Sequence, residues 1–256
     1  ANEQNILISQ DEQFDYSTLL PVHDDIKDAL AASQGKIGSL MLKFIKILEE
    51  SINKLHADTE EVTKIANDPK LSDPKTSIQE AANILVVLIA RTDEIHELAK
   101  NYNNYQNVMN LQKTKFDDVN ALVKDVKIKQ LMWETKTLWQ NETKEWFSAN
   151  FNLIDPNLLI DKVGEYKNNA TIAAKELPEN PAADDLCATI TDFSNLLPVV
   201  EDLKNPALQQ THIDQIELLL GSKIFGTGFT FRQLFDLHAF NYVDHIHMIS
   251  TQASNE

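Results

Sequence analysis

Glycine is scarce in this chain, and this scarcity most constrains how the chain can fold. Only 6 of the 256 residues are glycine. A β-sheet protein of this size needs more glycine, because tight turns require backbone angles that other residues rarely adopt. Leu, Ala, Lys, Glu, Gln and Asn are abundant instead. The sequence therefore predicts an all-α fold, an elongated helical bundle in which long helices are followed by shorter packed helices.

Five pairs of an Asx residue and a proline divide the chain into segments. The Asx side chain can cap the first free amides of a helix, and proline suits the first helical position because its φ is already fixed. Proline also disfavours helical geometry in the residue before it, so each pair marks a boundary. We interpret the first pair as part of a turn and the other four as helix starts. The pairs are Asp68-Pro69, Asp73-Pro74, Asp155-Pro156, Asn180-Pro181 and Asn205-Pro206.

A long first helix is predicted from about His23 to Asn67, with apolar side chains at three- and four-residue steps. Residues Ala1–Leu20 lack this periodicity, so we expect them to be extended or loosely attached. The apolar stripe of the first helix consists of Ile26, Leu30, Ile37, Met41, Phe44, Leu48, Ile52 and Leu55.

A second helical region is expected to start at Pro74, because no glycine or proline follows between Lys75 and Ile154. If this region is unbroken, about 75 residues rising about 1.5 Å each form a rod of roughly 110 Å. A break in the asparagine-rich stretch 101–110 is the alternative. Such helices must bury an apolar face on another element, since helical stability comes mostly from packing.

Shorter helices are expected toward the C-terminus. The change from long to short helices places a domain boundary near Lys129, which divides the chain into residues 1–130 and 131–256. The predicted segments are about Pro156–Lys175, Pro181–Leu197, Pro206–Leu220 with Gly221 as its terminator, and Thr230–Ala253 with a break near His238–Asn241.

Charge and composition exclude several classes of partner. The net charge of −16 disfavours nucleic acid, an anionic membrane and an acidic polymer such as a microtubule wall. The longest apolar run, Ile84–Ala90, is far shorter than the roughly 18 residues that cross a bilayer. The lone Cys187 excludes an internal disulfide and is compatible with a reducing compartment. We therefore expect a soluble, intracellular protein that binds neither nucleic acid nor membrane.

No group of residues predicts catalysis, a cofactor or a metal site. The stretch Gly221–Gly228 lacks the phosphate-binding order G-x-x-x-x-G-K-[ST]. His245 and His247 are two residues apart on a helix, so they do not face the same ion. For His212 we expect a structural hydrogen bond.

The three tryptophans favour a packing role. Trp139 and Trp146 are seven residues apart and share a helix face, whereas Trp133 is turned away by roughly a third of a circle. An aromatic pair of this kind more often anchors a helix–helix contact than a ligand.

The second half of the chain resembles a known family. Trp133-Glu-Thr-Lys-Thr-Leu-Trp139 and the Trp146, Phe151 and Asp155 that follow are similar to the opening of the second N-terminal region of dynein heavy chains, which includes the linker. Leu203-Lys-Asn-Pro-Ala-Leu208 is closer to axonemal than to cytoplasmic heavy chains. The family usually has an arginine and a tryptophan where this chain has Thr211 and Ile213. The residues of the linker-like signature are Trp133, Trp139, Trp146, Leu177, Pro178, Pro198, Asn205, Pro206 and His212.

This resemblance implies a non-catalytic mechanical element, with residues 1–130 like the tail and residues 131–256 like the N-terminal part of the linker. In the family, the linker crosses the AAA+ ring and bends with the nucleotide cycle, which moves the cargo-bound tail in ciliary motility. The implied partners are the remainder of the heavy chain and, on the tail half, dynein light or intermediate chains, without direct microtubule contact. The implied location is the cytoskeleton of the cytoplasm, in the axoneme of a cilium or flagellum. The alternative is a spectrin-like helical cytoskeletal adaptor.

Overall fold

The computed structural model describes residues 9–226 and 228–256. Within these ranges most residues are helical and no strand forms, although one isolated bridge pairs Asn150 with Thr230. The all-α prediction is confirmed. The elements are α1 (Gln10–Ala66), η1 (Pro69–Leu71), α2 (Ile78–Val108), α3 (Asp117–Ser148), η2 (Phe151–Leu153), α4 (Pro156–Glu176), α5 (Pro181–Ser194), α6 (Leu197–Leu203), α7 (Gln210–Leu220), α8 (Phe231–Asp236), η3 (Ala239–Tyr242) and α9 (Val243–Asn255).

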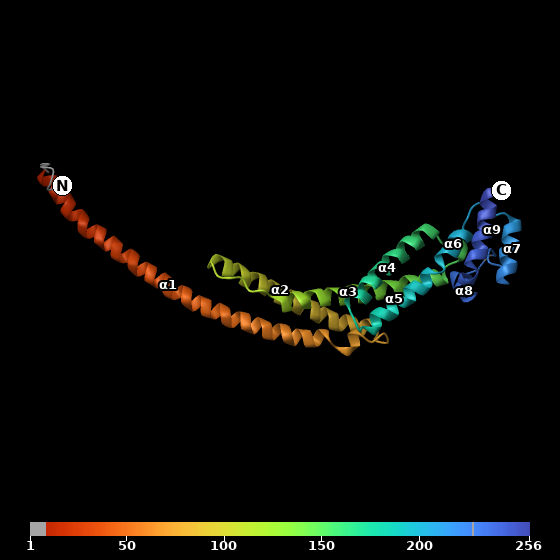
Figure 1. Ribbon diagram of the computed structural model, residues 1–256, viewed down its shortest axis with the longest axis horizontal. Helices are drawn as coiled ribbons and strands as arrows, with labels where there is room; N and C mark the ends of the chain where they lie inside the picture. The colour runs from red at the N-terminus through yellow and green to blue at the C-terminus, as the bar shows by residue number, and fades with distance from the viewer. Residues whose placement is uncertain (1–8, 227) are drawn as a thin grey trace.

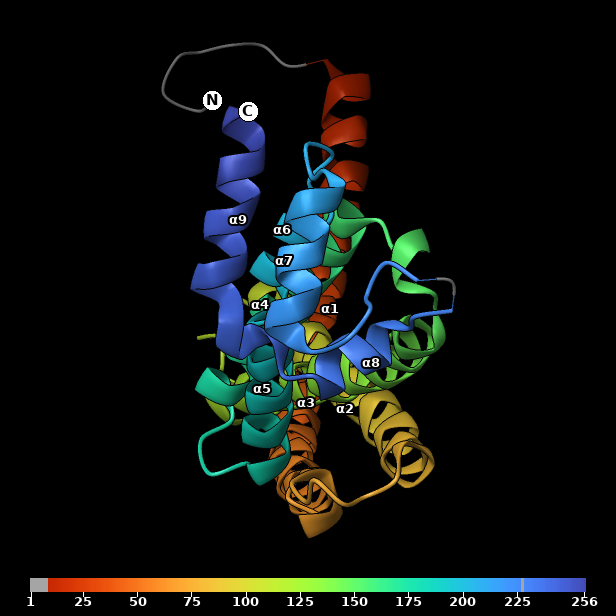
Figure 2. The same cartoon turned by 90° about the vertical axis from the view of Figure 1, so that its right-hand side faces the viewer.

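The long helices form one end of the molecule and the short helices the other. Figure 1 shows α1 reaching far beyond α2 and α3, while α6 to α9 gather at the opposite end. Figure 2, viewed from that end, shows α7, α8 and α9 in front of the longer helices. α2 packs on α1 and α3, α4 packs on α3 and α5, and α9 packs on α6 and α7. None of the helices in the described ranges is both long and apolar enough to span a bilayer.

α1 begins earlier than the sequence predicted. The Ser9 hydroxyl accepts a hydrogen bond from the Glu12 amide at 3.3 Å, and the Glu12 carboxylate accepts one from the Ser9 amide at 2.9 Å. This capping box satisfies amides that the first turn leaves free, and the helix then continues through Pro21. The expectation of an extended segment is therefore wrong for residues 10–20, while residues 1–8 lie outside the described residues.

The apolar stripe predicted for α1 is buried only in its second half. Leu48, Ile52 and Leu55 are buried against α2 and α3, whereas the earlier members of the stripe are exposed. The transition lies at Phe44, whose ring meets that of Tyr105 edge-on at 5.9 Å between centroids. The first part of α1, which carries these residues, extends past the tip of the α2–α3 pair (Figure 1).

The expected 110 Å rod is divided in two, so the alternative of a break is confirmed. α2 ends at Val108, and Asn110 adopts a left-handed backbone with φ of 55°. The Gln106 side chain stabilises the reversal by accepting from the Thr114 amide and donating to its hydroxyl, both at 2.8 Å. Asparagine tolerates the left-handed conformation better than most residues, which explains why the break falls in this stretch.

Only some of the Asx-Pro pairs act as predicted. Asp155 and Asn180 cap α4 and α5, as predicted, and Asp68 opens the short turn η1. The pair Asp73-Pro74 does not start a helix, because the Ser77–Glu80 capping box fixes the start of α2 at Ile78. Asn205-Pro206 does not start a helix either. The Asn205 side chain donates a hydrogen bond to Ser250 of α9 instead, and α7 begins at Gln210.

In the C-terminal part, most of the boundaries agree with the sequence. Gly221 ends α7 with a left-handed φ of 66°, and His238, with φ of 53°, separates α8 from η3 and α9 as expected. The predicted helix to Leu197 instead ends at Ser194, and α6 follows as a separate helix.

α3 runs unbroken across residues 129–131, the position of the expected domain boundary. It packs on α1 and α2 and also on α4 and α8. A single continuous helix therefore joins α1 and α2 to the short helices.

Candidate functional site

Three side chains on one face of α3 hold the connection between α1 and α2. They follow one another at steps of four and three residues, so they share a helix face. Each donates a hydrogen bond to a backbone carbonyl about 62 residues earlier in the chain. The bonds join Lys129 Nζ to Ala66 O at 2.8 Å, Trp133 Nε1 to Leu71 O at 3.2 Å, and Lys136 Nζ to Pro74 O at 2.8 Å. We call Lys129, Trp133 and Lys136 the carbonyl clamp.

The two lysines of the clamp are buried, with only 6% of each residue exposed. Lys129 also forms an ion pair with Asp125 at 2.6 Å, which compensates its charge. Burial lowers the pKa of Lys136, an effect that the charges of Asp185 and Asp73 partly oppose. The Lys136 ammonium lies 4.7 Å from the centre of the Trp133 ring, in cation–π range. The sequence indicated only Trp133 of this group, although both lysines share its helix face.

Trp139 and Trp146 form the second contact surface of α3. Their rings meet edge-on at 6.0 Å between centroids, which confirms that they share a face. Trp139 also contacts Phe193 of α5 at 5.0 Å and Tyr166 of α4 at 6.0 Å. Phe193 in turn meets Phe231 of α8 at 5.6 Å. The prediction that the pair anchors helix–helix contacts is therefore confirmed, and α3, α4, α5 and α8 meet in this aromatic cluster.

Tyr166 lies within this cluster and is almost fully buried, with 2% exposed. Burial raises the pKa of its phenol well above 10, and a hydrogen bond and the negative charge of Glu142 raise it further. The phenol therefore stays protonated at neutral pH and acts as a packing group.

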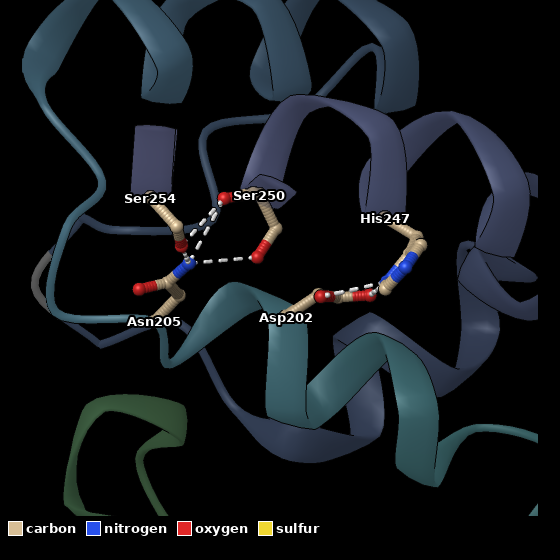
Figure 3. Close-up of polar contacts among 5 residues, drawn as sticks. All are labelled: Asp202, Asn205, His247, Ser250 and Ser254. Carbon is tan, nitrogen blue, oxygen red and sulfur yellow. Dashed lines mark hydrogen bonds and ion pairs between the residues drawn. The ribbon is translucent and has the colours of Figure 1, made fainter. Parts of the chain in front are cut away.

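Polar side chains on α6 and directly after it bind α9 (Figure 3). Asn205 Nδ2 lies 2.9 Å from Ser250 Oγ, 3.0 Å from Ser250 O and 2.8 Å from Ser254 Oγ. Asp202 pairs with His247 Nδ1 at 3.1 Å. These contacts join segments 45 to 49 residues apart and explain why Asn205 is drawn away from a helix start.

The remaining signature residues are distributed among other elements. Leu177 is buried at the end of α4, next to the exposed Pro178. Pro198 and Pro206 line a hollow of about 610 Å³ beside α6 and α9. His212 is 1% exposed, and its Nδ1 accepts the expected structural hydrogen bond from the Gln209 amide at 3.3 Å. The structure thus places the nine residues at several separate junctions.

The side chains described above form contacts between helices more than they form a group of reactive residues. Among residues 9–226 and 228–256, no three His, Cys, Asp or Glu side chains are grouped as a metal site would require. His247 pairs with Asp202, whereas His245 is exposed. The stretch Gly221–Gly228 connects α7 to α8 and includes residue 227, which lies outside the described part. Cys187 is partly buried, 4.0 Å from the Thr171 hydroxyl.

Comparison with known sequences assigns the family. Residues 119–256 match the family model described as dynein heavy chain, N-terminal region 2, which is more than half of the chain. The chain belongs to this family. The match confirms the resemblance inferred from the tryptophan and proline motifs, and it begins near the start of α3. Membership in a dynein family argues against the spectrin-like alternative.

The similar proteins are axonemal dynein heavy chains. Dynein axonemal heavy chain 6 of Homo sapiens is 28% identical over 243 residues, which is 94% of this chain and 6% of that protein. Dynein axonemal heavy chain 1 of Homo sapiens is 25% identical over 68% of this chain and 4% of its own length. Dynein axonemal heavy chain 2 of Mus musculus is 22% identical over 93% of this chain. The chain thus spans only about a twentieth of the length of these relatives.

Proposed function

We propose that this chain is a non-catalytic mechanical element of an axonemal dynein heavy chain. Residues 1–130 act as the end of the tail, and residues 131–256 act as the N-terminal part of the linker. The element transmits ATP-driven motion of the AAA+ ring to the cargo-bound tail in ciliary motility.

The continuity of α3 is the observation that carries this proposal. The carbonyl clamp fixes one face of α3 to the α1–α2 connection, and the aromatic cluster fixes another part of it to α4, α5 and α8. A displacement of the short helices must therefore move α3 and, with it, the long helices. Closely packed side chains transmit this displacement because protein interiors have low compressibility.

The partners and location follow from the family and from charge. The proposed partners are the remainder of the heavy chain, including the linker and ring, and dynein light or intermediate chains on residues 1–130. The proposed location is the axoneme of a cilium or flagellum, since the similar proteins are axonemal heavy chains. The net charge of −16 disfavours direct contact between this segment and the acidic microtubule wall.

The absence of catalysis is tested with the isolated chain. Purified protein incubated with ATP and magnesium is expected to show no turnover above the buffer. ATP hydrolysis that co-purifies with the monodisperse protein and persists after a second purification step would contradict the proposal.

The lever function is tested in a dynein heavy chain motor that carries this segment. A Gly-Gly-Ser insertion between Gln130 and Leu131 interrupts α3 at the clamp, and the same insertion after the exposed Gln112, in the α2–α3 loop, is the matched control. The α3 insertion is expected to slow microtubule gliding while ATP turnover is retained, and the loop insertion should change neither. Unchanged gliding with the α3 insertion would refute the lever function.

A further inference from the structure

Four contacts join α1 and the connection that follows it to α3, all at nearly the same separation in sequence. Three of them are the bonds of the carbonyl clamp, and the fourth joins His56 Nδ1 of α1 to Asp118 Oδ2 of α3 at 2.6 Å. In all four the partners are 62 or 63 residues apart. Because both partners advance along the chain together, α1 and α3 run side by side in the same direction. The pairs are His56 with Asp118, Ala66 with Lys129, Leu71 with Trp133, and Pro74 with Lys136.

This parallel arrangement determines how tension passes through the long helices. A pull that enters through α1 and leaves through the C-terminal end of α3 slides the two helices past each other along their common direction. The four contacts and the buried apolar face of α1 then share the load, since all of them are displaced together. The last of the four contacts holds Pro74, before α2 begins at Ile78. Tension therefore passes from α1 into α3 without entering α2.

The α2–α3 pair is arranged in the opposite way. α2 runs back along α3, and Ile78 at its start lines the same groove as Thr137 and Leu138 of α3 (Figure 1). Tension that reached the start of α2 would pull two neighbouring helix ends apart, so the contacts of the pair would break one after another from that end. Such a pair resists less force than helices whose contacts share the load.

We propose that the carbonyl clamp and the His56–Asp118 pair form a load-bearing catch, which keeps tension off residues 67–128 and, when it breaks, lets the chain lengthen in one step. The bypassed segment has 62 residues. At about 3.3–3.6 Å per residue it extends to roughly 200–220 Å. The catch thereby sets the load above which the lever stops transmitting force. This inference rests on the proposed function only for the direction of the tension.

Optical tweezers applied to the full chain test the catch. The handles are attached through Ile47→Cys on α1 and Leu138→Cys on α3, at positions that are 58% and 49% exposed, in a Cys187→Ser background. The pull then crosses the catch but not the short helices. The first rupture should release the bypassed segment in one step, a gain in contour length of roughly 200 Å or more. Release of this length in several smaller steps would overturn the proposal.

Three substitutions weaken the catch. Lys129→Met and Lys136→Met each remove one bond to a backbone carbonyl. Each should raise the rupture rate at a fixed load by about 10-fold, which corresponds to about 1.4 kcal/mol. His56→Ala removes a pair whose side chains are 38% and 41% exposed, so it keeps the fold even if the buried lysines are required for folding. It should raise the rupture rate by about 2- to 5-fold.

Gln106→Ala is the matched control, because it removes two hydrogen bonds at the α2–α3 turn, outside the path of the load. It should lower the free energy of unfolding in urea and leave the rupture rate unchanged. An equal rise in rupture rate for Gln106→Ala would overturn the proposal. So would an unchanged rate in the lysine variants or, if these do not fold, in His56→Ala. Microtubule gliding with the α3 insertion tests the lever function separately, so either proposal can fail without the other.

Discussion

Replacing Phe193 by alanine tests the aromatic cluster that joins α3 to the short helices. Phe193 lies on α5 and is 3% exposed. Its ring centre is 5.0 to 6.4 Å from the ring centres of five other residues, three on α3 and two on α8. These are Trp139, Trp146, Phe147, Phe231 and Phe235.

The size of the effect follows from what the substitution removes. Truncating a buried phenylalanine to alanine costs about 3–5 kcal/mol through lost transfer free energy and the cavity that remains. Aromatic pairs contribute about 0.5–1.5 kcal/mol each beyond burial, and Phe193 makes five of them, so we expect the upper part of that range, about 4–5 kcal/mol. This is a large share of the roughly 5–15 kcal/mol that stabilises a typical protein.

Urea unfolding followed by tryptophan fluorescence measures this loss, since Trp139 and Trp146 adjoin the substituted ring. The control is Leu153→Ala: Leu153 is 84% exposed, so its change should alter the free energy of unfolding by less than about 0.5 kcal/mol. A loss below about 1 kcal/mol for Phe193→Ala, or one equal to the control, would refute the reasoning.

Four further substitutions test three separate features. Gly164→Ala should stabilise the protein by about 1 kcal/mol, because the added methyl group meets open space within α4. Gly221→Ala should destabilise it by about 1–2 kcal/mol, because the φ of Gly221 is +66°. The thermal unfolding temperatures of the two variants should therefore shift in opposite directions. Thr92→Val should stabilise by about 1–2 kcal/mol in urea titration, since the buried Thr92 hydroxyl has no hydrogen-bond partner among the described residues; a destabilised variant would contradict this. The pKa of Tyr166 is raised from its ordinary value near 10, so above about pH 10 the unfolded chain loses a proton that the native chain keeps, and stability falls as pH rises. Tyr166→Phe should make this fall shallower in unfolding measured from pH 9 to 11, and an identical slope would show that the phenol is not responsible.

Local signals predicted much of the fold. Asp155, Asn180 and Gly221 act where the sequence placed them, because capping and the left-handed terminator depend on neighbouring residues alone. Two of the errors, at the starts of α1 and α2, arose where two local signals compete. The capping box at Ser9 starts α1, although the residues that follow lack a helical apolar periodicity. The capping box at Ser77 starts α2, although the Asp73-Pro74 pair indicated an earlier start.

The contact surfaces of α3 were only half predictable. The seven-residue spacing of Trp139 and Trp146 indicates a shared face and hence a packing role. Lys129 and Lys136 gave no such signal, because a lysine on a helix ordinarily faces solvent. Their acceptors are carbonyls of Ala66 and Pro74, 63 and 62 residues away, and only the folded chain brings them within reach. Long-range pairing of this kind has no counterpart in a local sequence pattern.

The rigidity of the path through α3 is tested most directly by a distance distribution across it. Spin labels at Val108, 80% exposed at the end of α2, and Leu218, 84% exposed on α7, report on the long and short helices in a Cys187→Ser background. Double electron–electron resonance should give one narrow distance peak, which the Gly-Gly-Ser insertion between Gln130 and Leu131 broadens. A broad or two-peaked distribution in the uninterrupted chain would contradict a stiff mechanical element.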